Sequence, residues 1–302
     1  METTIAQPQL DQSRNAWDHF DLDTVRSVSW LSIESVGKQT HSFPPTGSIV
    51  SYIDQLLVEA FPSRKEMVGA AVVCGDMEAE RGIFEQTPSV RFTDVAGFDL
   101  SETSLRRARP STFKFHPFLG DCNSLVLGPH QFDLIVGAHG IHHIFNIGGL
   151  FFQINKALRP GGILFIHEWV GPEKLQIPRA NALVARLLLC TLFTRKERTN
   201  HEGRVKGKFL QYSPGFFDPS EACNSLEIPA QLTRYFEVKS ELAYGSLCYP
   251  MFEGLGRNFH PNRRLDQVRI KFVLAVERFL TRMRVIKPLF LIAIAKKRAV
   301  WQ

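Results

Sequence analysis

The sequence predicts a doubly wound α/β domain, in which helices cover both faces of a mostly parallel sheet. From about residue 67 onward, short apolar runs of strand length alternate with segments of helical periodicity, and this alternation is typical of parallel strands joined by crossover helices. The runs are largely apolar, as expected of strands that are covered on both sides. The chain has 302 residues, of which 44% are apolar and 22% charged, and this composition is ordinary for a globular protein.

The central part of the chain supplies four of the predicted strands and the helices between them. Strands are predicted over residues 70–73, 89–99, 132–138 and 162–170, and helices over 78–86, over 101–109 and through Leu150, Ile154 and Leu158. Ser101 and Ser104 are suitable caps for the second helix, and the turn at residues 159–162 ends the third. Ligands of such sheets bind beyond the carboxyl ends of the strands, where the strand order reverses, so the site is expected there.

The segments outside this central part are predicted to be mainly helical. Residues 1–15 form a polar tail, and residues 16–63 have helical spacing, which is broken at 43–47 and resumes after the capping residue Ser48. A helix and a basic, glycine-containing loop follow the strand at 162–170. A strand over 236–244, a mainly helical stretch as far as Phe279 and a last strand over 287–297 complete the chain.

The chain is therefore divided into a helical N-terminal extension, residues 1–66, and a main domain, residues 67–302, with residues 171–235 as a helical insertion. Both outer segments carry aromatic side chains beside polar ones, namely Trp17, Phe20, Trp30, Phe43, Tyr212, Phe216 and Phe217. We expect the two segments to form a lid that excludes water and selects the substrate. Alternatively, the first segment covers a sheet face or joins two copies of the chain in a homo-oligomer.

Charge and cysteine content restrict the remaining classes of protein. The net charge of +6 is concentrated in residues 195–208 and 296–298, and such stretches are usually solvated, so they are weak evidence for a nucleic-acid partner. Five widely spaced cysteines without a C-x-x-C pair argue against a disulfide framework and a structural zinc site. The start of the chain does not resemble a secretory signal, and no window has the length of a membrane span. A cytoplasmic, reducing location is therefore expected.

Three features at successive strand ends predict an adenosine-binding site. Gly75 opens a turn into a helix, which lets backbone N–H groups approach a ligand closely. Asp99 ends the next strand, where a carboxylate can accept hydrogen bonds from both ribose hydroxyls. Asp121 lies in a loop before the third strand, where it can accept from an adenine amino group. The predicted cofactor-binding residues are Cys74, Gly75, Asp76, Glu80, Asp99, Leu100, Asp121, Cys122, Ala138 and His139.

These motifs resemble those of the class I S-adenosylmethionine-dependent methyltransferases. VAGFDLSETSLRRAR is similar to their second motif, GDCNSL to the adenine-side loop, FDLIVGAHGIHHI to the fourth-strand motif and ALRPGGILFIHEWVGP to the turn and fifth strand. The resemblance covers residues 68–172 and, more loosely, 218–228, which are similar to a bacterial branch of small-molecule and sugar methyltransferases. It implies a Rossmann-like, seven-stranded sheet with an antiparallel last strand, and S-adenosylmethionine as cofactor.

The first motif of the family departs from its usual acid-x-Gly-x-Gly-x-Gly pattern. Ala71 stands at the acid, Val73 at the first glycine and Met77 at the third, and only Gly75 is retained. The methionine end of the cofactor must then be held differently, and Asp76 and Glu80 are the candidates. A decayed site that no longer binds the cofactor is the alternative.

His142, His143 and Glu168 are the predicted catalytic residues. They follow the ends of neighbouring strands and should face the cleft. Methyl transfer to oxygen requires removal of a proton, and a histidine of near-neutral pKa can accept it. The alternative is that these histidines only shape the pocket and that catalysis proceeds by proximity. No metal site is predicted, although ligands on separate loops leave a His/Glu site open.

The predicted function is an enzyme that transfers the methyl group of S-adenosylmethionine to an oxygen, nitrogen or carbon atom of a small-molecule acceptor, such as a secondary metabolite or sugar. One alternative is an RNA or protein methyltransferase, although no Asn-Pro-Pro-Tyr-type motif follows the fourth strand and no nucleic-acid module is visible. Another is a non-catalytic partner protein of the same fold. The GxGxxG fingerprint of a dehydrogenase is absent.

Overall fold

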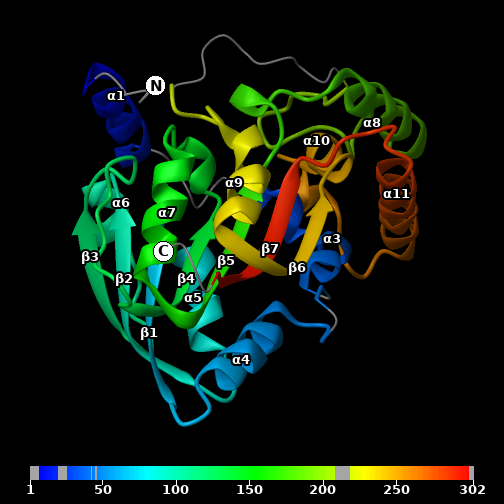
Figure 1. The fold of residues 1–302 in the computed structure, drawn as a ribbon. Helices are drawn as coiled ribbons and strands as arrows, with labels where there is room; N and C mark the ends of the chain where they lie inside the picture. Colours follow the sequence, from blue (N-terminus) through cyan, green and yellow to red (C-terminus); the bar gives the residue numbers. More distant parts are fainter. Residues whose placement is uncertain (1–6, 20–25, 42, 45, 208–217, 299–302) are drawn as a thin grey trace.

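A seven-stranded sheet with the order β3-β2-β1-β4-β5-β7-β6 organises the protein (Figure 1). The computed structural model describes residues 7–19, 26–41, 43–44, 46–207 and 218–298. β1 to β5 pair in parallel, and β7 is antiparallel to both of its neighbours. The strands are β1 (Glu66–Val72), β2 (Arg91–Asp99), β3 (Lys114–Leu119), β4 (Phe132–Ala138), β5 (Leu158–Trp169), β6 (Phe236–Tyr244) and β7 (Phe290–Lys297). The predicted doubly wound sheet with an antiparallel last strand is confirmed.

Helices cover both faces of the sheet. One face carries α7 (Ile147–Ala157) and α9 (Ile228–Tyr235). The other carries the remaining larger helices, α3 (Glu34–His41), α4 (Ile49–Ala60), α5 (Glu78–Glu85), α6 (Glu102–Arg106), α8 (Arg179–Leu192), α10 (Cys248–Phe252) and α11 (Arg264–Arg282). Ser48 and Ser101 cap α4 and α6, as expected from the sequence. Within the described residues, no helix is long and apolar enough to cross a membrane.

The alternation of side chains along each strand produces two separate cores. In β4, Leu134 and Val136 pack into one core, and Ile135 packs into the other. All seven residues of β4 are buried, since helices cover the sheet on both sides. The apolar character of the central strands therefore follows from their position in the middle of the sheet.

The N-terminal residues and the sheet edge differ from the sequence-based expectations. Residues 7–15, predicted as part of a polar tail, form with residues 16–18 the helix α1 (Gln7–Asp18) beside α6. The strand β3 was not predicted, because it is an exposed edge strand that contains Pro117 and lacks an apolar run. Trp30, in the short 3-10 helix η1 (Trp30–Ser32), is 2% exposed and packs in the main core with Tyr244 and Phe290. Part of the predicted N-terminal extension is therefore built into the core.

Candidate functional site

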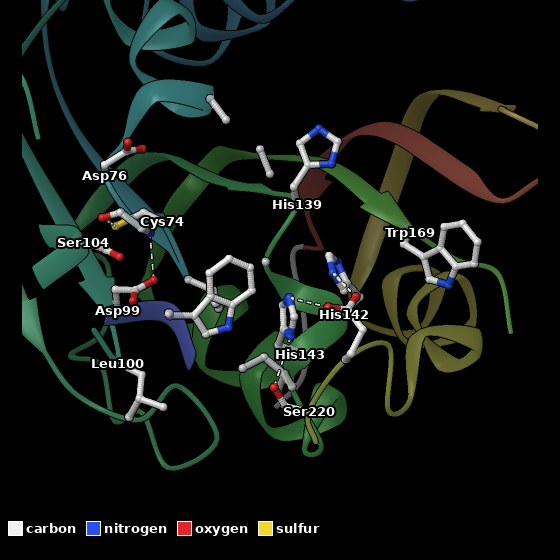
Figure 2. Close-up of a pocket in the computed structure, with 18 of the residues that line it drawn as sticks. Cys74, Asp76, Asp99, Leu100, Ser104, His139, His142, His143, Trp169 and Ser220 are labelled. Atoms are coloured by element: carbon white, nitrogen blue, oxygen red, sulfur yellow. Dashed lines mark hydrogen bonds and ion pairs between the residues drawn. The ribbon is translucent and has the colours of Figure 1, made fainter. Parts of the chain in front are cut away.

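A cavity of about 620 Å³ opens at the carboxyl ends of the parallel strands, beside the point between β1 and β4 where the strand order reverses. All ten predicted cofactor-binding residues line it, as do His142 and His143. Figure 2 shows Cys74, Asp76 and Asp99 at one end of the pocket and the two histidines at the other. Glu168 does not line the cavity: it is fully buried behind His142. Its predicted position in direct reach of a substrate is therefore wrong.

The turn after β1 has the backbone conformation of a glycine-rich loop, although only one of its three left-handed positions is a glycine. Val73 (φ +53°), Gly75 (φ +52°) and Met77 (φ +63°) all lie in the left-handed region. These are the positions at which the resembling motif has glycine, and a β-branched residue such as Val73 is strongly disfavoured there. A Cβ on Gly140 would lie 2.3 Å from the Val73 carbonyl oxygen, so the ends of β1 and β4 approach closely. The packing of the two strand ends keeps this loop shape despite the side chains.

Asp99 anchors this turn from the end of β2. Its Oδ2 accepts a hydrogen bond from the Gly75 N–H at 2.8 Å, and its Oδ1 accepts from the Ser101 N–H at 2.9 Å (Figure 2). Burial raises the pKa of the Asp99 carboxyl, and this effect outweighs the two backbone hydrogen bonds, which lower the pKa. On the adenine side, Asp121 accepts from the backbone and side-chain amides of Asn123. Both acids therefore lie at the cavity where the sequence places them, Asp99 at the end of β2 and Asp121 in the loop after β3.

The two acids proposed for the methionine end of the cofactor have different environments. Asp76 forms a two-pronged ion pair with Arg26, with N–O distances of 2.6 and 2.7 Å. Burial would raise the pKa of Asp76, but Arg26 lowers it. Glu80 is 1% exposed, and within the described part of the chain its Oε2 has no hydrogen-bond partner. Burial raises the pKa of Glu80 well above its usual value. Glu80 thus presents at the cavity a buried oxygen that could bind a hydrogen-bond donor of a ligand.

His142 lies between two buried carboxylates. Its Nδ1 is 2.7 Å from Glu168 Oε2, and its Nε2 is 3.4 Å from Glu221 Oε1. Glu168 Oε1 accepts from the N–H groups of Gly140 and Ile141, which holds the loop after β4. Burial alone would lower the pKa of His142, but the hydrogen bonds to Glu168 and Glu221 raise it to about 10. His142 is therefore protonated at neutral pH in this arrangement, which disfavours it as a base.

His143 is held by the loop that follows the undescribed residues 208–217. Its Nδ1 lies 3.1 Å from Ser220 Oγ and 3.2 Å from Asp218 Oδ2, and its Nε2 lies 3.9 Å from Glu221 Oε2 (Figure 2). Burial would raise the pKa of Asp218, but the hydrogen bond and charge of His143 hold it well below its usual range. The Nε2 atoms of both histidines are thus directed at the same carboxylate, Glu221.

The helix α1 closes this end of the pocket. Ser13 Oγ and Trp17 Nε1 both donate hydrogen bonds to Asp218, at 2.8 and 2.7 Å. The indole of Trp17 meets the His143 ring edge-on at 5.2 Å between centroids. Ser101 Oγ, at the start of α6, donates to Asp18. A helix from the N-terminus is therefore fastened to both sides of the cleft.

His139 also lines the cavity, but in a neutral form. It follows the last residue of β4 with φ +59°, and its ring lies 4.2 Å from that of His167 between centroids. Burial lowers the pKa of His139 to about 4. It can accept or donate a hydrogen bond, but it carries no charge at neutral pH.

Several residues at the cavity were not singled out from the sequence. Asp218, Ser220 and Glu221 belong to a stretch whose resemblance to the family was noted without assigning roles. Arg26 and Tyr249 also line the pocket, and no local pattern marked them. The aromatic residues predicted to form the lid lie in different places. Trp17 and Trp30 line the cavity, whereas Phe43 packs against the core. Phe20, Tyr212, Phe216 and Phe217 lie outside the described residues.

The predicted helical insertion contributes less to the pocket than expected. Within residues 171–207 and 218–235, only Leu175, Ser220 and Glu221 line the cavity. The helix α8 packs on α10, at the side of the molecule (Figure 1). Its apolar pattern reflects this packing and not the covering of the site, so the prediction that it forms a lid is not supported for α8.

The strand order, the strand-end acids and the cavity at the reversal point define a class I methyltransferase fold. Residues 66–166 match the family model described as a methyltransferase domain. The chain is 28% identical over 92 residues to a sterol 24-C-methyltransferase of Candida albicans, and 32% identical over 89 residues to the mitochondrial arginine hydroxylase NDUFAF5 of Danio rerio. These alignments cover 28% and 30% of this chain, and only 24% and 27% of the respective relatives.

A solved structure extends the likeness in fold to the whole chain. The cyclopropane synthase MmaA2 of Mycobacterium tuberculosis superposes with a TM-score of 0.51 and 14% sequence identity, over 97% of this chain and all of that one. Residues 66–166 therefore form a methyltransferase domain, and the chain has the class I S-adenosylmethionine-dependent methyltransferase fold. The family implies S-adenosylmethionine as cofactor, and the site fits it: Glu80 presents an unpaired buried oxygen, and Asp99 lies beside the Gly75 turn at the cavity.

Proposed function

We propose that the protein transfers the methyl group of S-adenosylmethionine to a small-molecule acceptor. The observation that carries this proposal is the single cavity, which joins the Gly75–Asp99 turn to the histidines and carboxylates of the opposite wall. When bound, S-adenosylmethionine supplies a methyl group on an electrophilic sulfonium. The cavity is partly closed by α1 and by residues 26–32, which favours a small acceptor over a folded RNA or protein substrate.

The residues at the two ends of the cavity have separate roles in this proposal. Asp99 and Asp121 would bind the adenosine part, and Glu80 the amino group of the methionine part. Asp76 is left to its ion pair with Arg26, which holds the N-terminal segment against the turn. On the acceptor side, His143 is the better candidate for taking a proton, because His142 already carries one between Glu168 and Glu221. Glu168 acts as a positioning residue through His142 and the loop after β4.

The helix α1 serves as the lid in this proposal. It contacts the body of the protein through polar groups, with Ser13 and Trp17 bound to Asp218 and with Asp18 bound to Ser101. Such contacts can open and close without exposing a large apolar core. Residues 26–41, in contrast, carry the buried Trp30, Ile33 and Val36 and are permanent structure. Deleting residues 1–19 should leave cofactor binding intact and reduce acceptor turnover; a protein that no longer folds would show that α1 is structural.

The test of the function begins with the purified protein. Mass spectrometry should find S-adenosylmethionine or S-adenosylhomocysteine retained, or calorimetry should show that S-adenosylhomocysteine binds. Incubation with a metabolite extract and a donor labelled in its methyl group should then yield a labelled small molecule, and Asp99→Ala should reduce the labelling at a donor concentration that does not saturate the variant. Binding without any labelled product in extracts, RNA or protein would favour a non-catalytic partner protein. Absence of binding would refute the proposal.

Hydroxylation, in which dioxygen supplies the inserted oxygen atom and a two-electron co-substrate reduces the other oxygen atom to water, is a second candidate function. One relative is named as an arginine hydroxylase, and His142, His143 and Glu221 form the two-histidine, one-carboxylate set typical of iron(II) oxygenases. The mass of the product separates the two reactions, because methylation adds one carbon and two hydrogens, whereas hydroxylation adds one oxygen.

A further inference from the structure

We propose that His142, His143 and Glu221 bind a divalent transition-metal ion in the wall of the pocket. Each residue offers one ligand atom, these atoms all lie within 4.8 Å of one another, and all three residues are buried. The Nε2 atoms of His142 and His143 lie 3.4 and 3.9 Å from the Glu221 oxygens. Ligand atoms around a tetrahedral zinc ion lie about 3.3 Å apart. Shifts of about 1 Å, shared by three side chains, therefore suffice to reach a common ion.

The groups behind the histidines provide the second observation. His142 Nδ1 is bonded to Glu168, and His143 Nδ1 contacts Asp218 and Ser220. Histidines that bind metals almost always donate their other ring nitrogen to a carboxylate or carbonyl, which fixes the tautomer and orients the ring. Here both rings have such a carboxylate, and both therefore direct Nε2 toward Glu221. A histidine with only a structural role requires no such matched pair.

The ligand set indicates which ions would bind. Two imidazole nitrogens and one carboxylate suit Zn²⁺, Fe²⁺, Co²⁺ or Ni²⁺ better than Mg²⁺ or Ca²⁺, which prefer oxygen ligands. Three protein ligands leave a position open on the cavity side for water or for a ligand oxygen. If the proposed function is correct, this position would take a hydroxyl or carboxylate oxygen of the acceptor and favour its deprotonated form. The ion site itself does not depend on that function.

The experiment uses the full chain, freed of metal with a chelator. Titration with Zn²⁺ in a calorimeter and with Co²⁺ by visible absorption should show one ion per chain, with a Co²⁺ spectrum of low coordination number. Glu221→Gln should weaken binding more than Glu221→Asp, which keeps the charge. Glu168→Gln should weaken it about 10–100-fold without removing a ligand. The control is His116→Gln, because His116 is paired with Asp94 at the sheet edge, outside the cluster.

Three results would overturn the metal site: no ion bound by the wild type, equal binding by wild type, Glu221→Asp and Glu221→Gln, or an equal loss in His116→Gln. Affinity for S-adenosylhomocysteine, measured in the metal-free protein, tests the proposed function separately. A protein that binds S-adenosylhomocysteine but no ion would retain the function and lose the metal site.

A different surface carries a second inference. The exposed sides of α8 and α11, which we name the α8–α11 face, combine apolar with basic side chains. The large apolar residues are Leu183, Leu187, Leu265, Val268, Phe272, Phe279 and, at the end of α11, Met283; the charged ones are Arg179, Arg186, Arg264, Lys271, Arg278 and Arg282. The only acids in these two helices, Asp266 and Glu277, are buried. Every exposed charge of the two helices is therefore positive.

The two helices lie at the same side of the molecule (Figure 1). Near the start of α8, Asn181 hydrogen-bonds both backbone groups of Lys287, which follows α11. After α8, Glu197 pairs with Arg269 of α11, and the Arg269 guanidinium lies over Phe193. We infer that the α8–α11 face docks on an anionic membrane surface, where the apolar side chains enter the interface and the cations meet lipid phosphates. A second copy of the same face would place cations against cations.

Co-sedimentation of the full chain with vesicles tests this inference. The protein should bind vesicles of phosphatidylcholine with phosphatidylglycerol, and bind pure phosphatidylcholine vesicles at least about tenfold more weakly. Phe272→Ser with Phe279→Ser, and separately Lys271→Glu with Arg278→Glu, should each reduce binding by a similar factor. Phe152→Ser, an exposed phenylalanine on α7, is the control. Equal binding to both vesicle types, no binding, or a dimer in ultracentrifugation that the same substitutions dissolve would overturn the inference.

Discussion

The two ends of the pocket are built in different ways. At the cofactor end, polar partners come from successive strand ends: Asp99 holds Gly75 and Ser101, within 24 residues along the chain. At the acceptor end, Asp218 is held by Ser13 and Trp17, which lie 205 and 201 residues away. The first end forms with the sheet itself, whereas in the second the hydrogen bonds of Ser13 and Trp17 to Asp218 depend on the N-terminal helix. Loss of one end should therefore leave the other largely intact, and the following substitutions test that independence.

The largest effect is expected at the acceptor end. His143→Ala should lower turnover about 10²–10⁴-fold, the usual contribution of a positioned acid–base group, because it removes either the base or a metal ligand. Calorimetry should find the affinity for S-adenosylhomocysteine nearly unchanged. His116→Ala, outside the pocket, is the control and should keep wild-type turnover. If His143→Ala lost less than tenfold, the histidine would have only a role in shaping the pocket.

At the cofactor end, Asp99→Ala should weaken binding of S-adenosylhomocysteine by about 1–3 kcal/mol, the cost of leaving polar groups without partners. The substitution removes the acceptor for the Gly75 N–H as well as a partner for the ligand. Asp94→Ala serves as the control, since Asp94 is on the same strand but binds His116 away from the cavity. Equal affinities of Asp99→Ala and the wild type would remove Asp99 from the binding site.

The stability of the folded protein should depend on pH through Glu80, which lies at the cofactor end of the pocket. Its pKa is raised in the folded protein by burial, so its contribution to stability is fully present below the unfolded pKa of about 4.5. That contribution is lost as the pH rises through the folded pKa. In the ligand-free protein, the melting temperature of Glu80→Gln relative to the wild type should therefore rise from about pH 5 to about pH 8. Glu85→Gln, on the same helix, should show no such trend; a flat difference for Glu80→Gln would contradict the assignment.

The smallest effect concerns the glycine-like turn. Val73→Gly should increase the free energy of unfolding by about 0.5–1 kcal/mol, because relief of left-handed strain outweighs the loss of a partly exposed side chain. Met77→Gly relieves similar strain but empties a core position that is 3% exposed, and should destabilise the protein. Urea denaturation of both variants measures the contrast. If both were destabilising, the strain at Val73 would be smaller than its φ indicates.

Sequence reasoning was most effective where structure depends on neighbours in the chain. The caps Ser48 and Ser101, the central strands and the strand-end acids all follow local patterns and were confirmed in position. It failed at β3, whose edge position needs no apolar run, and at α1, whose polar sequence becomes ordered through Asp218 and Ser101. The helix α8 carried an apolar pattern that could not reveal whether it packs on the pocket or on α10.

The sequence by itself determined the doubly wound sheet and the cofactor end of the pocket, because strand length, helical period and strand-end residues are properties of contiguous chain. Only the tertiary structure decided the rest. It brought Glu221 close to both His142 and His143, set Arg26 on Asp76 and left the Oε2 atom of Glu80 without a hydrogen-bond partner among the described residues. It also brought Ser13 and Asp218, which are 205 residues apart in the chain, into contact. The geometry of all these contacts depends on packing across the whole fold, which no local pattern encodes.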